Sequence, residues 1–463
     1  MSYLNQFKKG YFVNLENKKT ESIFPKSDFP IFLENSNLIW FDNGATTQKP
    51  SATINCIREY YEKFNSNIHR SPHHLSMVSS IMFDETREIT ASYLGCQAKE
   101  IVFVKGTTEG INFLANSLNF EKLLGKNIST NLPNNITCPN DKNQNQLNQL
   151  ITYSGIISKP HTLPSTTILL TNMEHHSNIV PWQMLYQKGL ANIEYLIYDK
   201  DNNKLNLNQL EAMLSRNPSI KVVSVTHVSN VLGITNPIRD MADIVHKYGA
   251  ILIVDGAQGI PHHKVNVREL DCDAYVFSSH KLFGPTGVGV VYCKETIYQF
   301  LEPWQGGGSM IKDVTLYTNT YQEPPHKFEA GTPNIADIIA FGSTLKYLEK
   351  IDWSKVEAYE NELTTYMYQS LKKIPNITIL GDTTNNKVPI YSFVIPDIDN
   401  KELLTKLDNH GIAIRYGHHC SMPIIRHYGY ENVYRASLAP YNTFQEIDYF
   451  VSTILNFVST NKK

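Results

Sequence analysis

The chain has 463 residues, which is long enough for two domains with substantial cores. Its 42 lysines and arginines balance 44 aspartates and glutamates, so it offers no basic stripe for nucleic acid. No apolar run reaches the ~18 residues of a membrane span, and residues 1–9 carry neither a signal core nor an arginine-rich transit pattern. We therefore expect a cytoplasmic small-molecule enzyme that binds neither nucleic acid nor membranes.

Short apolar runs alternate along the chain with segments of helical spacing. Leu207, Leu210 and Leu214 show this spacing, because residues three and four apart share one face of a helix. Such alternation is typical of an α/β fold, with a mostly parallel sheet covered by helices on both sides. The runs predicted to be strands are 100–104, 167–170, 221–226 and 251–254.

The alternation fails between about 120 and 164, where asparagine is abundant and large apolar residues are few. Such a composition cannot bury enough surface to order itself. We expect a flexible surface insertion, with a partner-binding segment as the alternative. Three units are predicted: an N-terminal segment (1–38), a large domain (39–319) and a small α+β C-terminal domain (320–463).

Polar residues follow each of the four predicted strands. Ligands of open α/β sheets bind beyond the carboxyl ends of the strands, so we expect these polar segments to meet at one pocket. They lie at 105–109, 173–176, 227–230 and 255–258.

An acid and a lysine in this part of the chain suit pyridoxal phosphate (PLP). Asp255 follows the run 251–254, and Lys281 lies between apolar residues with glycines close behind. The lysine can form a Schiff base with the cofactor aldehyde, and the aspartate can pair with the pyridinium nitrogen. Burial would depress the lysine pKa, as such a nucleophile requires. Taken singly, Asp255 would more often be a helix cap and Lys281 a solvated surface group.

Other polar residues suit the phosphate and the ring of that cofactor. Residues 106–108, Gly-Thr-Thr, open a helical pattern and could bind an anion, although they also form an ordinary N-cap. Ser278 and His280 could supply further donors. Either His175 or His176 could stack on the ring or move a proton, with a structural core histidine as the alternative. Adjacent residues of an extended chain point to opposite sides. One cation is therefore not expected to bind both His175 and His176, and we predict no metal site.

Two arginines and one cysteine remain as candidates. Arg435 and Arg415 could each bind a substrate carboxylate bidentately, or lie on the surface. The six cysteines form no C-x-x-C pair, which argues against a disulfide framework or zinc knuckle. Cys420 follows two histidines, and a thiol near imidazoles loses its proton more readily and becomes a nucleophile. Redox or structural roles are equally plausible, but beside PLP the thiolate could take sulfur from a bound cysteine.

Together these motifs resemble the cysteine desulfurases of the fold-type I, class V aminotransferase superfamily. Arg-Tyr-Gly-His-His-Cys-Ser-Met-Pro at 415–423 is similar to the Arg-x-Gly-His-His-Cys loop of the second, SufS-type group. The similarity runs from about residue 41 to residue 443 and omits the N-terminal extension and the insertion. The other matching motifs are Phe-Asp-Asn-Gly-Ala-Thr-Thr-Gln-Lys-Pro at 41–50, Asn-Ile-His-Arg at 67–70, Met-Glu-His-His-Ser-Asn-Ile-Val-Pro-Trp at 173–182, His-Val-Ser-Asn-Val-Leu-Gly at 227–233 and Phe-Glu-Ala-Gly-Thr-Pro-Asn at 328–334.

The resemblance implies a role for each candidate residue. Lys281 would form the Schiff base and shuttle the proton, Asp255 would pair with the ring nitrogen, and Cys420 would accept sulfur. His175 would stack on the ring, and Gln258 would touch its hydroxyl. The residues implied to hold the phosphate are Thr107, Thr108, Ser278, His280 and, from the second subunit of a homodimer, Thr332. Those implied to hold the substrate carboxylate are Asn230 and Arg435, and we keep Arg415 as a further candidate for the same group.

The resemblance also implies a reaction and partners. L-cysteine would become L-alanine, and its sulfur would stay on Cys420 as a persulfide. An acceptor of the SufE or SufU kind and a SUF scaffold would then use the sulfur for iron–sulfur clusters. Selenocysteine lyase is the nearest alternative activity. A non-catalytic metal-binding or scaffold protein, with a cation held by the histidine pairs, is the alternative from another class.

The chain departs from the family pattern at three positions. Gly44 replaces the usual alanine, Ser279 the usual glycine, and Tyr416 the common threonine. Ser279 places a Cβ beside Lys281, and Tyr416 adjoins the Cys420 loop. We therefore expect cofactor binding to be better preserved than substrate preference.

Overall fold

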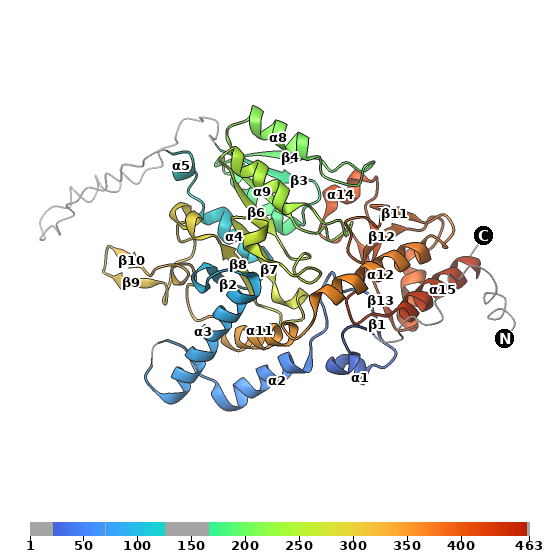
Figure 1. Cartoon of the computed structure of the whole chain (residues 1–463), viewed down its shortest axis with the longest axis horizontal. Helices are drawn as coiled ribbons and strands as arrows, with labels where there is room; N and C mark the ends of the chain where they lie inside the picture. The colour runs from blue at the N-terminus through green and yellow to red at the C-terminus, as the bar shows by residue number, and fades with distance from the viewer. Residues whose placement is uncertain (1–21, 70, 126–165, 461–463) are drawn as a thin grey trace, which may run out of the picture.

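A seven-stranded sheet forms the centre of the computed structural model, which describes residues 22–69, 71–125 and 166–460 (Figure 1). Its strand order is β2-β8-β7-β6-β5-β3-β4. Neighbours from β4 to β7 run parallel, whereas β8 is antiparallel to both β7 and β2. The strands are β2 (Ile101–Val104), β3 (Thr167–Thr171), β4 (Asn192–Leu196), β5 (Ile220–Thr226), β6 (Ile251–Asp255), β7 (Ala274–Ser278) and β8 (Gly289–Cys293).

The four strands predicted from apolar runs are β2, β3, β5 and β6 of this sheet. Every residue of β3 and β6 is buried. A strand covered on both faces needs apolar side chains at successive positions, so it appears in the sequence as a continuous apolar run. The predicted α/β fold with a mostly parallel sheet is confirmed.

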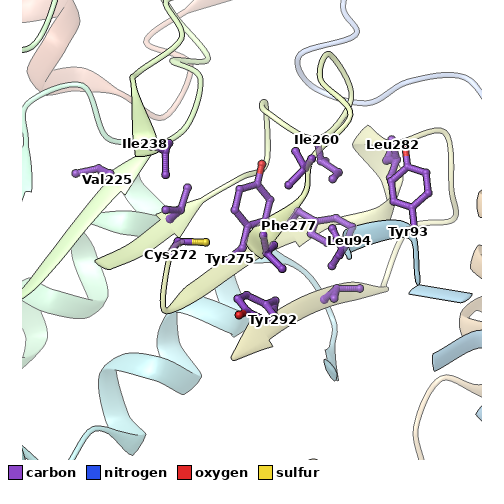
Figure 2. Close-up of a cluster of buried hydrophobic side chains, with 14 of the residues drawn as sticks. Tyr93, Leu94, Val225, Ile238, Ile260, Cys272, Tyr275, Phe277, Leu282 and Tyr292 are labelled. Atoms are coloured by element: carbon purple, nitrogen blue, oxygen red, sulfur yellow. The ribbon is translucent and has the colours of Figure 1, made fainter. Parts of the chain in front are cut away.

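Two layers of helices cover the sheet. Helices α4 and α7 pack with Val222 and Ile253 in one hydrophobic cluster, whereas α8 and α9 pack with Val223 and Leu252 in another. Successive residues of β5 and β6 therefore point to opposite layers. Figure 2 shows part of the second cluster, in which Tyr275 of the sheet lies among other buried side chains that include Phe277 and Tyr292. The helices are α4 (Thr107–Ser117), α7 (Val180–Gln187), α8 (Leu207–Arg216), α9 (Ile238–Lys247) and α10 (Val267–Leu270).

Helices α2 (Ser51–Glu59), α3 (His74–Leu94) and α11 (Ile335–Leu348) form a further packed group. Gly342 lets α11 approach α3 closely, because a Cβ at this position would lie 2.6 Å from Thr86 Oγ1. Further elements before the C-terminal part are α1 (Pro30–Glu34), α5 (Phe120–Leu123) and the antiparallel hairpin of β9 (Ile311–Val314) and β10 (Asn319–Tyr321).

The C-terminal part builds an antiparallel sheet in the order β11-β12-β15-β14. Helices α12, α13 and α15 pack on it in a hydrophobic cluster of their own. Near the start of the described chain, β1 (Ile39–Trp40) pairs in parallel with β13 (Ile412–Ala413), so residues far apart in sequence join there. The remaining elements are β11 (Thr378–Leu380), β12 (Ile390–Val394), β14 (Arg415–Gly417), β15 (Val433–Ser437), α12 (Trp353–Leu371), α13 (Asn400–Asn409), α14 (Met422–His427) and α15 (Phe444–Thr460).

Most of the asparagine-rich segment predicted at 120–164 lies outside the described residues, and Phe120–Leu123 at its start form α5. Within the described ranges, every helix is too short or too polar to cross a membrane.

Candidate active site

One cavity of about 270 Å³ lies beyond the carboxyl ends of β3, β5, β6 and β7. The N-terminus of α4 and the loop that carries Cys420 complete its wall. The four polar segments predicted to converge therefore do meet. The site residues predicted from sequence that line this cavity are Thr107, Thr108, His175, Asn230, Asp255, Gln258, Ser278, His280, Lys281, Arg415, Cys420 and Arg435.

Lys281 and Asp255 lie on neighbouring strand ends of this cavity. Asp255 ends β6 at 2% exposure, and its Oδ1 accepts a hydrogen bond of 3.0 Å from the Ala257 N–H. Burial raises the pKa of Asp255, and the nearby Lys281 charge opposes that rise. Burial also lowers the pKa of Lys281 to about 8, against the opposing charge of Asp255. The site thus holds an amine that is readily deprotonated beside an acid that can face a cation.

The N-terminus of α4 forms the opposite end of the cavity. The Thr107 N–H and its hydroxyl each lie 2.8 Å from Ser278 Oγ, which joins this helix end to the end of β7. Gly106 precedes the helix, and Gly289 of β8 passes beside it: a Cβ on Gly289 would lie 2.5 Å from the Gly106 Cα. Two glycines therefore let β8 approach a helix N-terminus whose N–H groups can bind an anion.

His175 enters the cavity as a neutral ring. Its Nδ1 accepts a hydrogen bond of 3.1 Å from the Ser177 N–H and lies 2.7 Å from Ser177 Oγ, which places the ring proton on Nε2. Burial lowers the pKa of His175 to about 3, and the Lys281 charge adds to this effect. A neutral, fixed imidazole can stack on an aromatic ligand.

A buried acid holds both predicted arginines. Asp42 accepts hydrogen bonds from Arg415 Nε and Nη2, the latter at 2.7 Å, and from Arg435 Nη2 at 3.3 Å. Arg415 and Arg435 face each other across the β14–β15 pair, so one carboxylate reaches both. Arg435 is 2% exposed, and its Nη1 donates to the Asn230 carbonyl at 3.1 Å.

The Cys420 loop is held by hydrogen bonds from two neighbouring segments. The His176 N–H donates to the Cys420 carbonyl at 2.6 Å, and the Asn230 side chain donates to the His419 carbonyl at 2.8 Å. Ser421 Oγ lies 2.9 Å from Asn230 Oδ1. His419 and Cys420 adopt left-handed φ values of +49° and +54°, which side chains other than glycine rarely adopt. This turn leaves the Cys420 side chain exposed at the cavity.

Sequence reasoning missed residues in and around the cavity: Gly44 lines it, whereas Asp42 and Lys49 contact residues that line it. Asp42, Gly44 and Lys49 belong to the 41–50 motif, which was recognised without roles for its members. Gln258 Nε2 donates to the Gly44 carbonyl at 2.6 Å, and Lys49 Nζ donates to the His280 carbonyl at 2.8 Å. His419 also lines the cavity. A polar motif far from the lysine in sequence was the only available signal for these residues.

Thr332 is the one predicted site residue that lies elsewhere. It lines a second cavity of about 850 Å³, together with His69, Arg87 and Glu329. Within one chain, Thr332 therefore does not reach the group around Lys281.

The residues present fit PLP. The amine of Lys281, the carboxyl of Asp255 and the α4 N-terminus offer partners for an aldehyde, a ring nitrogen and a phosphate. Two cavity-lining groups, Arg435 Nε and His419 Nδ1, are buried and lack a hydrogen-bond partner among the described residues. Buried polar atoms are normally paired, so these two are consistent with a polar ligand in the cavity.

Known proteins share both the sequence and the fold. The family model for class-V aminotransferases matches residues 39–131 and 150–450. Probable cysteine desulfurase 1 of Mycobacterium leprae (strain TN) is 39% identical over 93% of this chain and 64% of that protein. A cysteine desulfurase of Cronobacter sakazakii is 37% identical over 93% of this chain and 96% of that protein. The apo structure of the cysteine desulfurase from Thermococcus onnurineus NA1 has a TM-score of 0.81 and 31% identity, covering 94% and 97% of the two chains.

The chain spans less than two thirds of the length of the Mycobacterium leprae relative, and nearly all of the Cronobacter relative. The family model covers most of the chain, including the segments that carry Lys281 and Cys420. The chain belongs to the class-V aminotransferase family and, within it, to the cysteine desulfurases.

Proposed function

We propose that this protein is a PLP-dependent cysteine desulfurase that converts L-cysteine to L-alanine and collects the sulfur on Cys420. One observation carries the proposal: the exposed Cys420 thiol shares a cavity with Lys281 and Asp255. A PLP enzyme without sulfur chemistry has no need of a cysteine on a left-handed turn at the mouth of its site. The relatives named cysteine desulfurase support the same reading.

Lys281 and Asp255 are assigned to the cofactor. When bound, PLP supplies an electron sink that weakens the C–S bond of the substrate. Lys281 would hold the cofactor through its Nζ, and the same amine, once free, would carry the α-proton of the substrate. Its pKa of about 8 keeps an appreciable free-base fraction near neutral pH. Asp255 would pair with the ring nitrogen, and the neutral imidazole of His175 would stack on the ring.

Two groups of side chains are assigned to the two anions of the site, the cofactor phosphate and the substrate carboxylate. Thr107, Thr108, Ser278 and His280 surround the phosphate end, where Ser278 already contacts the α4 N-terminus. At the other end, the buried Arg435 with its unpaired Nε is assigned to the substrate carboxylate, with Arg415 beside it. The Asn230 side chain holds the Cys420 loop, and we assign it to the substrate carboxylate only after that loop moves.

Cys420 is assigned to the sulfur transfer itself. Its thiolate attacks the sulfur of the bound substrate, an S–S bond forms, and the substrate C–S bond breaks. The electron pair of the broken bond returns to the substrate carbon, which gains a proton and leaves as L-alanine. One L-cysteine and one enzyme thiol thus give one L-alanine and one enzyme persulfide, without an added oxidant.

The finer assignments concern partners. We assign the protein to the SufS type, with an acceptor of the SufE or SufU kind and a SUF scaffold for iron–sulfur clusters. This assignment is supported by the 415–423 motif. We also propose a homodimer in which Thr332 reaches the phosphate of the neighbouring subunit. Its place in a separate cavity supports that assignment.

The experiment is alanine formation from L-cysteine with a reductant, in wild type, Cys420→Ala and Lys281→Ala. We expect alanine from the wild type and at least a hundredfold less from both variants. If Cys420→Ala forms as much alanine as the wild type, the enzyme is a lyase that does not use the thiol. Selenocysteine would then be tested as its substrate. No alanine from any of the three, with PLP bound and a sulfur acceptor present, would overturn the proposal.

A further inference from the structure

The Cys420 loop brings together three groups that ligate soft metal ions. One ring nitrogen each of His176 and His418 and the Sγ of Cys420 lie within 4.8 Å of one another. The two rings are stacked, with centroids 5.6 Å apart and planes inclined by 28°. Each histidine comes from a different pair, so the objection that neighbouring residues point to opposite sides does not apply to this set.

The hydrogen bonds of the loop hold both rings with an unprotonated nitrogen. His418 Nδ1 accepts a hydrogen bond of 3.0 Å from the Cys420 N–H, and His176 Nε2 accepts one of 3.3 Å from the Met422 N–H. An accepting ring nitrogen carries a lone pair, which is the form of histidine that binds a metal. A metal ion bound at these two nitrogens would displace one backbone N–H donor from each.

The third ligand is also available. Cys420 is exposed, so a cation from solvent reaches it directly. Arg415 and Arg435 lie with Cys420 in the wall of the same cavity. These arginines oppose the approach of a cation, but the thiolate offsets part of the metal charge.

We propose that His176, His418 and Cys420 form a Zn²⁺ site that sequesters the sulfur-accepting thiol. Two imidazoles and one thiolate suit Zn²⁺, which takes four ligands in a tetrahedron. The fourth position stays open to water or a small thiol. Bound metal lowers the nucleophilicity of the Cys420 sulfur, so it slows attack on the substrate sulfur and protects the thiol from oxidation. This inhibitory consequence rests on the proposed function, whereas metal binding itself does not.

The test measures Zn²⁺ binding to the PLP-loaded full-length protein by competition with a chromophoric chelator. L-cysteine is left out, because its own thiol binds zinc. We compare wild type with His176→Ala, His418→Ala, His418→Gln and Cys420→Ser. His418→Gln keeps a hydrogen-bond acceptor for the loop but supplies no imidazole. His410→Ala is the matched control, because His410 is equally half-buried but lies at the end of α13.

We expect one tightly held Zn²⁺ per chain in wild type and in His410→Ala. Each cluster variant should bind Zn²⁺ at least tenfold more weakly. Even the loss of a residue that only hydrogen-bonds to a metal ligand typically weakens metal binding about 10–100-fold. Unchanged affinity in His176→Ala and His418→Gln would overturn the proposal.

A second readout is alkylation of Cys420 by iodoacetamide, followed by peptide mass spectrometry. Zn²⁺ should slow alkylation at least tenfold in wild type and in His410→Ala, but not in His418→Gln. Zinc that binds without protecting Cys420 would overturn the proposal. Neither readout needs turnover, so failure of the zinc site and failure of the desulfurase assignment are separate results.

Discussion

The buried amine of Lys281 makes cofactor loading depend on pH. Burial lowers its pKa to about 8, and only the free base attacks an aldehyde. Raising the pH through 8 therefore increases the reactive fraction, and the increase levels off well below the ordinary lysine pKa. We predict that the rate of PLP uptake by the cofactor-free protein rises between pH 6 and roughly pH 8, then flattens.

Cofactor absorbance at a fixed PLP concentration measures this rate. A rate that continues to rise tenfold per pH unit up to roughly pH 10 would show an amine with ordinary solvation.

The Asp42 carboxylate is predicted to be essential for the arginine end of the cavity. Asp42→Asn leaves the buried Arg435 without its counter-ion, and breaking a buried pair typically costs about 3–5 kcal/mol. We expect a loss of this order in the free energy of unfolding and a higher KM for L-cysteine. Denaturant titration and steady-state kinetics measure the two effects.

The control is Glu431→Gln, which removes an exposed partner of Arg426. Such a pair contributes less than about 1 kcal/mol. Equal effects of the two substitutions would mean that Asp42 does not anchor the arginines.

Among single residues, the sequence indicates those whose side chains could react or bind a ligand directly. It does not indicate residues such as Asp42, which position another site residue. Lys281, Asp255 and Cys420 stand out because their residue types are unusual in their local settings. Asp42 does not, since its partner Arg415 lies far away in sequence and only the fold brings them together. Likewise, the amide of Asn230 was predicted at the substrate carboxylate, whereas in the structure it holds the Cys420 loop.

Between elements, the approach of β8 to the N-terminus of α4 depends on Gly289. A Cβ at this position would meet the backbone of Gly106 at 2.5–2.8 Å, and a backbone cannot move aside as a side chain can. We predict that Gly289→Ala destabilises the protein by about 1–3 kcal/mol. It should also weaken PLP binding, because it displaces the helix end assigned to the phosphate.

Gly306→Ala is the matched control, since a Cβ there meets nothing within 4 Å. Thermal unfolding and PLP titration of the two variants would settle the point. If Gly289→Ala behaves like Gly306→Ala, the close approach has no energetic consequence.

The elements differ in how well the sequence predicts them. Strands such as β6 are buried on both faces and produce apolar runs that local analysis detects. The antiparallel insertion of β8 between β2 and β7 leaves no local signal, because strand order is set by long-range packing. The pairing of β1 with β13 is equally invisible, since each strand has two residues and their partners are more than 370 positions apart.

For the whole molecule, the proposed homodimer predicts a site shared between subunits, with Thr332 at the phosphate of the neighbouring subunit. Thr332→Val should weaken PLP binding roughly 10–100-fold, the loss expected for a hydrogen bond to a charged group. A hybrid of one Thr332→Val subunit and one Lys281→Ala subunit should recover one site of wild-type affinity. That site combines Lys281 of the first subunit with Thr332 of the second.

PLP titration of purified hybrids measures this recovery. Hybrids that keep the weak affinity of Thr332→Val would place Thr332 in its own subunit or away from the phosphate. The homodimer itself is measured by light scattering on the same samples.

The most direct test of the central claim is the mass of the enzyme after one round with L-cysteine, without a reductant or a sulfur acceptor. We predict that the peptide containing Cys420 gains the mass of one sulfur atom, in step with one L-alanine released per site. Lys281→Ala should show neither product. Alanine released without added sulfur on Cys420, or sulfur found on another cysteine, would contradict the account.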